Sequence, residues 1–241
     1  MNRHPLRANK SPIKLLAVAA VVAAAAVFAP GSSSASDSSQ GSWERLRTED
    51  GISVFRKEIP GSKFVAFRGE GDVDAPILSV ASVLVDVPHE KDWIDSVVEA
   101  RVLHQVTETE YVMYSHVGTP PTMSDRDFVT DVSLTLNPPQ KSLTVQMHSI
   151  TDPAAPTTSY VRAELKDSVF VLSSVDHGRK THVVAEIHCD PKGGVAAWMV
   201  NWFQKNWGYN TVASMRRQVQ RTGGKMDPRL TTMLKEKGFF D

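Results

Sequence analysis

The sequence contains a single cysteine, Cys189, among its 241 residues. A disulfide within the chain is therefore excluded, and the fold must depend on a hydrophobic core, which a chain of this size can bury as one domain. The sequence also lacks an excess of positive charge, because 27 Lys and Arg are balanced by 27 Asp and Glu. Such a composition offers no basic surface for nucleic acid, so we expect no nucleic-acid partner.

The short motifs of several enzyme classes are absent as well. The sequence contains no G-x-S-x-G nucleophile elbow, no H-E-x-x-H, no C-x-x-C pair, no G-x-G-x-x-G turn and no P-loop. Each of these motifs holds a nucleophile, a metal ligand or a phosphate-binding backbone in a fixed local geometry. Without them, the sequence predicts no catalytic residue and no cofactor.

One predicted strand carries residues that could bind a metal. His182, Glu186 and His188 alternate along it, so their side chains share one face and could hold Zn²⁺. The residues at the alternate positions are apolar and are expected to face the core, which leaves the polar three in water. We therefore predict no metal site. Cys189 is predicted to be a small buried thiol, since its neighbour His188 points to the opposite face.

The one long apolar run is Leu15–Phe28, which follows four basic residues. Its 14 residues are fewer than the roughly 20 that a membrane span needs, but they suit the apolar core of a secretory signal. Small residues at 33–35 provide a cleavage site. We expect residues 1–35 to be removed, which leaves 27 − 4 = 23 basic and 27 acidic residues in a soluble monomer that is periplasmic or secreted. The alternative is an uncleaved N-terminal membrane anchor that faces the periplasm.

Residues 36–42 are predicted to form a polar linker, residues 43–223 a domain, and residues 224–241 a C-terminal tail. Within the domain, a short helix at Trp43–Thr48 precedes about nine strands, and two helical segments interrupt them at Ala75–Asp86 and Lys91–Ile94. The predicted strands are Ile52–Ile59, Phe64–Val73, Glu99–Thr107, Glu110–Val117, Arg126–Leu136, Ser142–Ile150, Ser159–Leu165, Ser168–Val175 and Thr181–Cys189. Sequential strands with short connections are typical of an antiparallel sheet, so we predict an α+β fold.

The last predicted element is a long helix, Val195–Arg221, which carries three of the five tryptophans. Gly208 interrupts it and is expected to weaken it by about 1 kcal/mol relative to alanine. Apolar residues form two ridges on the helix, one with Val200, Phe203, Trp207, Thr211 and Met215 and the other with Trp198, Trp202 and Tyr209. If the helix packs directly on the curved sheet, the two form a core. If they stand apart, the space between them is a ligand cavity.

Five short motifs, in order over residues 43–221, resemble those of the START (steroidogenic acute regulatory protein-related lipid transfer) domain family. The most specific is Arg126-Asp-Phe-Val129, which follows a proline-rich approach. The others are Asp50-Gly-Ile-Ser-Val54, Lys91-Asp-Trp93, Tyr160-Val-Arg162, and Asp190-Pro-Lys-Gly193 with Trp198-Met-Val-Asn-Trp202. The resemblance implies a helix-grip fold, in which the C-terminal helix covers a hydrophobic tunnel that holds one lipid, without catalysis.

The resemblance also implies which residues line the tunnel. They are inward-facing positions of three strands together with the first ridge of the helix: Tyr111, Met113, Ser115, Phe128, Thr130, Val132, Met147, Val200, Phe203, Trp207, Thr211 and Met215. Arg126 and Asp127 are interpreted as a structural ion pair at the start of a strand. The other ridge of the helix is expected to touch a membrane surface transiently, where indole rings are favoured.

Departures from the family pattern bear on the identity of the lipid. In members that bind phosphatidylcholine, an arginine three residues before the tryptophan of the short helix holds the phosphate, and Glu90 stands at that position here. In sterol-binding members, a buried acid and an arginine stand where this chain has Met113 and Val132. An uncompensated buried charge costs several kcal/mol, so we expect a neutral lipid, most simply a sterol or a related isoprenoid. The alternatives are a phospholipid carrier and an enzyme similar to an aromatic polyketide cyclase.

Overall fold

A computed structural model of the chain describes residues 41–196, 200–201 and 205–239. Its strands are β1 (Glu44–Glu49), β2 (Ile52–Lys57), β3 (Ala66–Val73), β4 (Val97–Gln105), β5 (Glu110–Val117), β6 (Arg126–Asn137), β7 (Ser142–Ser149), β8 (Val161–Arg162), β9 (Glu164–Val175) and β10 (Lys180–Asp190). The α-helices are α1 (Ile77–Val85), α3 (Trp207–Arg221) and α4 (Pro228–Glu236), and 3₁₀ helices span Val87–Asp92 (η1), Pro138–Gln140 (η2) and Asp176–Gly178 (η3). No helix in these ranges is both long enough and apolar enough to span a bilayer.

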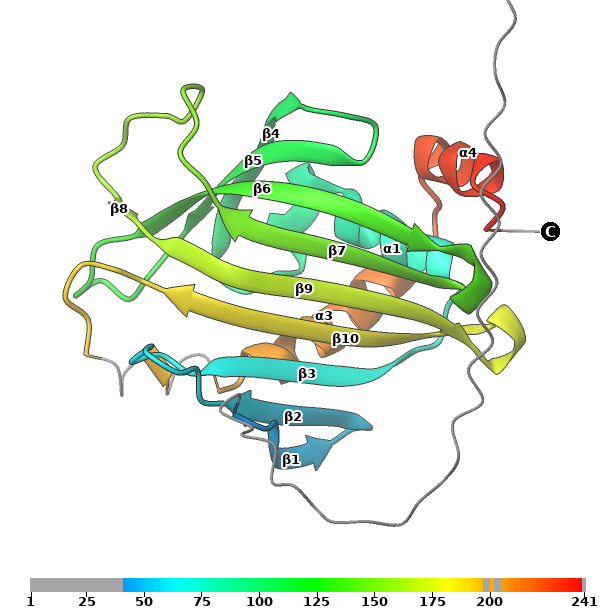
Figure 1. Cartoon of the computed structure of the whole chain (residues 1–241), viewed down its shortest axis with the longest axis horizontal. Coiled ribbons are helices and arrows are strands. Elements are labelled where there is room, and N and C mark those ends of the chain that lie inside the picture. Colours follow the sequence, from blue (N-terminus) through cyan, green and yellow to red (C-terminus); the bar gives the residue numbers. More distant parts are fainter. Residues whose placement is uncertain (1–40, 197–199, 202–204, 240–241) are drawn as a thin grey trace, which may run out of the picture. The chain divides into compact units, whose positions relative to one another are not determined.

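The strands form one 10-stranded sheet in the order β1-β2-β3-β10-β9-β7-β6-β5-β4, with the short β8 beside β6 (Figure 1). Only the β6–β8 pairing is parallel. Most neighbours in the sheet are joined by short turns, whereas the pairing of β3 with β10 joins strands that are far apart in the sequence. The α+β fold with an antiparallel sheet is thus confirmed, with ten strands in place of about nine.

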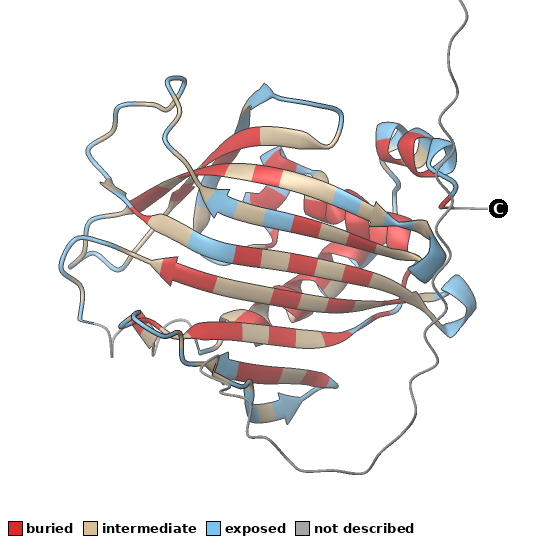
Figure 2. Cartoon of the chain, viewed as in Figure 1, coloured by how far each residue is buried: buried red, intermediate tan, exposed pale blue. Residues whose placement is uncertain are grey.

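Burial alternates along the central strands, as Figure 2 shows. On β10, Val183 and Ala185 have no exposed surface, whereas His182 and Glu186 are only partly buried. Because successive side chains of a strand point to opposite faces, one face of the sheet is apolar. Helices α1 and α3 lie across this apolar face (Figure 1). The core of the domain therefore lies between the sheet and these two helices.

Helix α3 packs against β2, β3, β10 and α1. It crosses β3 at two glycines whose backbones touch: a Cβ on Gly208 would lie 2.6 Å from the amide nitrogen of Gly69, and a Cβ on Gly69 would overlap the carbonyl oxygen of Gly208. The role of Gly208 therefore differs from the prediction. It is the residue that allows the helix to approach the strand at backbone distance.

Two predictions for the C-terminal segment need correction. The predicted helix Val195–Arg221 is not continuous, because Lys205 and Asn206 form a turn and α3 begins at Trp207. The side chain of Asn206 accepts a hydrogen bond of 2.9 Å from Arg47 on β1, which ties this turn to the sheet. Phe203, Trp198 and Trp202 lie outside the described residues. The predicted tail contains α4, whose apolar side chains are buried.

The prediction of a short helix at Trp43–Thr48 is wrong, because this segment forms β1 and pairs with β2. The hairpin turn consists of Asp50 and Gly51, with φ values of 51° and 70°. Two-residue hairpins favour positive φ at both positions, and an Asp-Gly pair adopts it readily. The Asp-Gly turn therefore determines that this segment is a strand, although its composition favours a helix.

Candidate ligand-binding site

The apolar face of the sheet is divided into two parts. Helix α3 covers β2, β3 and β10 directly, so this part is ordinary core. Over β5, β6 and β7 lies a partly open cavity of about 400 Å³, to which the end of α1 and the start of α4 also contribute side chains. Its lining consists of Val85, Val102, Gln105, Glu108, Thr109, Tyr111, Val132, Leu134, Val145, Asp227, Arg229, Leu230 and Met233. The two alternatives left open by the sequence, core and cavity, thus both occur, side by side.

Strand register places several of the predicted tunnel residues in rows across this face. Tyr111 pairs with Val132, Val132 with Met147, and Met147 with Ser168. A second row contains Met113 and Thr130, and a third contains Ser115 and Phe128. Neighbouring strands are roughly 4.8 Å apart, so the first row extends for about 14 Å across four strands. Among the twelve predicted residues, Tyr111 and Val132 line the cavity itself.

The predicted residues on the helix occupy the covered part of the face. The ring of Trp207 meets the ring of Phe170 edge-on, with 6.3 Å between the centroids. Thr211 and Met215 are buried, as is Val200, which precedes the turn. These side chains pack in the core beside the cavity, and none of them lines it.

The contribution of α4 to the cavity was not predicted from the sequence. Leu230 and Met233 line the cavity, and Leu234 is fully buried behind them. A signal was available, because these three residues recur at helical spacing and Asp227-Pro228 is a typical helix start. Four lining residues on the strands, Val102, Gln105, Leu134 and Val145, were also not predicted as ligand contacts.

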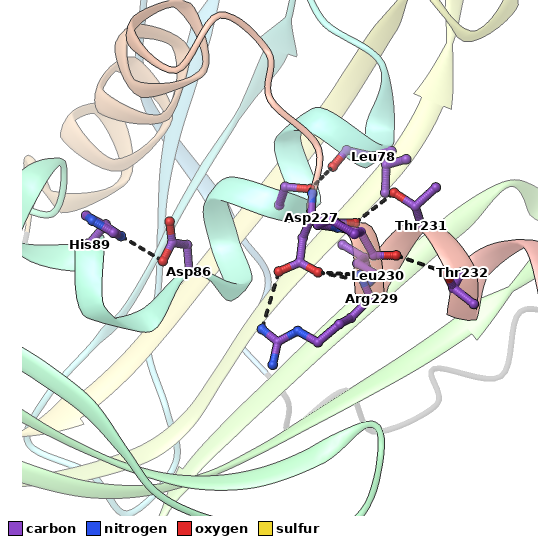
Figure 3. Close-up of polar contacts among 10 residues, drawn as sticks. Leu78, Asp86, His89, Asp227, Arg229, Leu230, Thr231 and Thr232 are labelled. Atoms are coloured by element: carbon purple, nitrogen blue, oxygen red, sulfur yellow. Dashed lines mark hydrogen bonds and ion pairs between the residues drawn. The ribbon is translucent and has the colours of Figure 1, made fainter.

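Helix α4 is anchored at its N-terminus, as Figure 3 shows. The side-chain carboxylate of Asp227 accepts hydrogen bonds from the backbone amides of Arg229 (2.8 Å) and Leu230 (3.1 Å). The backbone amide of Asp227 donates a hydrogen bond to the hydroxyl of Ser82 on α1 (2.8 Å). The Ser82 hydroxyl in turn donates to the carbonyl of Leu78. A single capping residue therefore starts the helix and fixes it to α1 over the cavity.

Replacing Asp227 by alanine should weaken α4 selectively. Loss of an N-cap side chain costs about 1 kcal/mol, so the amides of α4 should exchange with solvent about fivefold faster, while those of β6 and β7 keep their rates. Hydrogen exchange measured by mass spectrometry tests this. Arg229→Ala is the matched control, because that guanidinium is 92% exposed and its contact with Asp227 contributes little. Equal acceleration in both variants would contradict the assigned cap.

The predicted ion pair at the start of β6 also needs correction. Asp127 is fully buried and pairs with Arg162, at 2.7 Å and 3.1 Å, and not with its neighbour Arg126. Burial alone would raise the pKa of Asp127, but the hydrogen bonds from Arg162 and Thr158 hold it below the usual value. Arg126 donates to the backbone carbonyls of Ser124 and Pro191. Adjacent residues on a strand point to opposite faces, which separates the two side chains.

The polar trio on β10 interacts with three different residues. His182 lies 2.7 Å from Asp72, Glu186 lies 2.5 Å from Arg68, and His188 lies 3.1 Å from Ser62. Within the described part of the chain, no three His, Cys, Asp or Glu side chains are grouped as metal ligands. Cys189 is buried, and burial raises the pKa of its thiol to about 12.

The short helix η1 places Glu90 inside the protein. Glu90 is 9% exposed, and burial raises the pKa of its carboxyl to about 8. Burial, and then the charge of Glu90, raise the pKa of Tyr111, which lines the cavity, whereas Glu90 does not belong to the lining. The site is thus a cavity with an apolar wall that includes Val132, Leu134 and Val145, and its lining also contains the charged residues Glu108, Asp227 and Arg229.

Comparison with known proteins gives a consistent result. The sequence profile of the START domain family matches residues 31–225. The protein PA1579 of Pseudomonas aeruginosa is 27% identical over 210 residues, which are 83% of this chain and 96% of that protein. Phosphatidylcholine transfer protein of Bos taurus is 27% identical over 183 residues, 74% of this chain and 84% of the relative.

Solved structures agree with the fold. The crystal structure of human STARD10 superposes with a TM-score of 0.68 at 19% identity, over 75% of this chain and 74% of that one. A STAR-related lipid transfer protein from Xanthomonas axonopodis superposes with a TM-score of 0.65 at 22% identity, over 74% of this chain and 98% of that fragment.

Proposed function

The chain belongs to the START domain family, and from this premise we propose that it binds one lipid molecule in the cavity over β5–β7 and transfers it between membranes without catalysing a reaction. The observation that carries the proposal is the cavity itself. Its volume of about 400 Å³ falls in the usual range for small-molecule sites, and side chains such as Val132, Leu134, Val145 and Met233 give it an apolar wall.

We further propose that the lipid is uncharged, as a sterol or a related isoprenoid is. Glu90 supports this, because a buried carboxyl provides no positive charge to hold a phosphate at this position. The bovine relative is named for phosphatidylcholine transfer, so a phospholipid is the alternative. Membrane contact during transfer, and action as a monomer, are parts of the same proposal.

Replacing Leu134 by aspartate should weaken lipid binding by about 10- to 100-fold. The side chain lines the cavity beside Val145, its partner on β7, and a carboxylate there would bring a charge against the apolar part of the lipid. Equilibrium titration with a fluorescent sterol and with fluorescent phosphatidylcholine measures both affinities. Val98→Asp is the matched control, because Val98 is 53% exposed on the neighbouring edge strand β4.

Each outcome of this titration has a clear meaning. Tighter binding of phosphatidylcholine than of sterol would overturn the choice of a neutral lipid and leave the carrier function standing. Equal losses in both variants would show that the lipid does not occupy this cavity. Turnover of a phenolic polyketide substrate, with no lipid bound, would favour the enzyme alternative.

We also propose that the protein acts outside the cytoplasm. The proposal is supported by the basic and apolar segment up to Phe28 and the small residues that follow it, all of which lie outside the described residues. Cell fractionation and the intact mass of the native protein test it. A full-length mass in the cytoplasmic fraction would overturn it.

A further inference from the structure

The lining of the cavity separates into an apolar part and a polar part. The apolar side chains come from several strands, from the end of α1 and from α4. The polar ones come from only two short segments, the end of β4 with the turn that follows it, and the start of α4. They are Gln105, Glu108, Thr109, Asp227 and Arg229. Polar side chains gather where a cavity meets water, so the cavity opens between these two segments.

Exposure agrees with this position of the opening. Glu108 and Arg229 are exposed although they line the cavity, and Val102 is 42% exposed and lines it as well. The turn between β4 and β5 lies beside α4 in Figure 1. Within the described part of the chain, no hydrogen bond or ion pair joins residues 105–109 to residues 225–229. The two sides of the opening are therefore not tied to each other.

Exposed apolar side chains stand on both sides of the opening. Six large hydrophobic residues are exposed among those that the structure describes, and Val102, Val106 and Met226 are three of them. Val106 lies in the β4–β5 turn between the lining residues Gln105 and Glu108, and Met226 directly precedes Asp227 on the other side. Apolar side chains that gather at the surface mark a place of contact with another apolar body.

Helix α3 is fixed in a different way. Its Gly208 meets Gly69 at backbone distance, and the guanidinium of Arg216 donates hydrogen bonds to the backbone carbonyls of Asp50 (2.8 Å) and Asp72 (2.7 Å). Lifting α3 off the sheet would break all of these contacts at once. The family resemblance implies that this helix covers the tunnel, but the gap beside α4 offers a passage that leaves α3 in place.

We propose that lipid enters and leaves the cavity between the β4–β5 turn and α4, and that Val106 and Met226 contact the bilayer as it does so. This inference rests on the proposed lipid-transfer function and adds the place of membrane contact. A lipid that crossed the opening into water would expose apolar surface at a cost of about 25 cal/mol per Å². A bilayer against the opening removes this cost, and it accepts apolar side chains flanked by polar ones such as Glu108 and Arg229.

The single cysteine of the chain makes a direct test possible. Cys189 is buried, so a cysteine introduced at the surface can be labelled selectively. Val106→Cys and Met226→Cys, each carrying a nitrobenzoxadiazole probe, are mixed with phosphatidylcholine vesicles. Their emission should rise about twofold or more as the probe leaves water. Val98→Cys is the matched control, because Val98 and Val106 are both 53% exposed and Val98 lies near the other end of β4, so its emission should stay unchanged.

A second measurement separates transfer from binding. Val106→Asp should slow the transfer of dehydroergosterol between phosphatidylcholine vesicles by about 10-fold, because a carboxylate enters the bilayer surface less readily than a valine does. Its equilibrium affinity for the sterol should change by less than about twofold, since Val106 does not line the cavity. Val98→Asp should match the wild type in both measurements.

The outcomes distinguish this inference from the proposed function. Unchanged emission at residues 106 and 226 during normal sterol transfer would overturn the inference and leave the carrier function standing. An equal rise at residue 98 would also overturn it, because the contact would then not be confined to the opening. A wild type that neither binds nor transfers lipid would overturn both. Thermal unfolding of each variant establishes that the comparison is made on folded protein.

Discussion

Replacing Gly208 by alanine should lower the free energy of unfolding by about 3 kcal/mol, although the same change would stabilise an isolated helix. An alanine inside a helix is worth about 1 kcal/mol more than a glycine. At this position the added Cβ would lie 2.6 Å from the amide nitrogen of Gly69 and 2.8 Å from the carbonyl carbon of Arg68. The atoms it meets are backbone, which cannot rotate away, so α3 would have to lift off β3.

The sign of the change makes this a sharp test. Urea denaturation followed by tryptophan fluorescence gives the free energy of unfolding. Gln220→Ala, at an exposed position of the same helix, is the control and should change stability by less than about 0.5 kcal/mol. A stabilised Gly208→Ala variant would mean that the helix and the strand are not in backbone contact.

Replacing Glu90 by glutamine should increase the free energy of unfolding of the delipidated protein at pH 8. The increase should be about 3 kcal/mol larger than the change that the same substitution causes at pH 5. The pKa of Glu90 is about 8 in the folded protein and about 4.5 in the unfolded chain. Folding therefore takes up a proton between these values, and the wild type loses stability as pH rises through this window. One pKa unit corresponds to about 1.4 kcal/mol, so a shift of this size gives several kcal/mol in full.

Glutamine has no proton to take up, so the variant should lack this part of the pH dependence. Chemical denaturation of both proteins at pH 5, 6.5 and 8 gives the comparison, and all other titrating groups cancel in the difference. Below about pH 5 the two should be similar, because Glu90 is protonated in the folded wild type. Parallel stability profiles over the whole range would show that Glu90 keeps its ordinary pKa and is hydrated.

Much of the sheet could be predicted because strand periodicity is a local property. The family resemblance, read with strand alternation, places Val132 and Met147 on the inner face, and the register puts both in one row. The antiparallel topology followed from the short turns between strands. Before Asp50 and Gly51, the composition of the chain predicted a helix, whereas the Asp-Gly pair favours a hairpin turn. The segment forms a strand of that hairpin, so the turn determined its structure.

Contacts between segments that are distant in the sequence could not be predicted, because periodicity does not report them. The pairing of Asp127 with Arg162 and the contact of Gly69 with Gly208 each join parts of the chain that lie far apart in sequence. For Glu90, the sequence showed that a phosphate-binding arginine is replaced by an acid. Only the fold shows that its carboxyl is buried.

The position of α4 bears on how the protein should be expressed for study. The family profile ends at residue 225, and α4 begins at Pro228. A fragment cut at the end of the profile would keep the whole sheet and α3, yet it would lose Leu230 and Met233 from the cavity wall. Such a fragment should fold. Its lipid should nevertheless dissociate faster than from the longer chain, because the side of the cavity formed by α4 would be open to water. Affinities measured on it would describe a site that lacks the wall formed by α4.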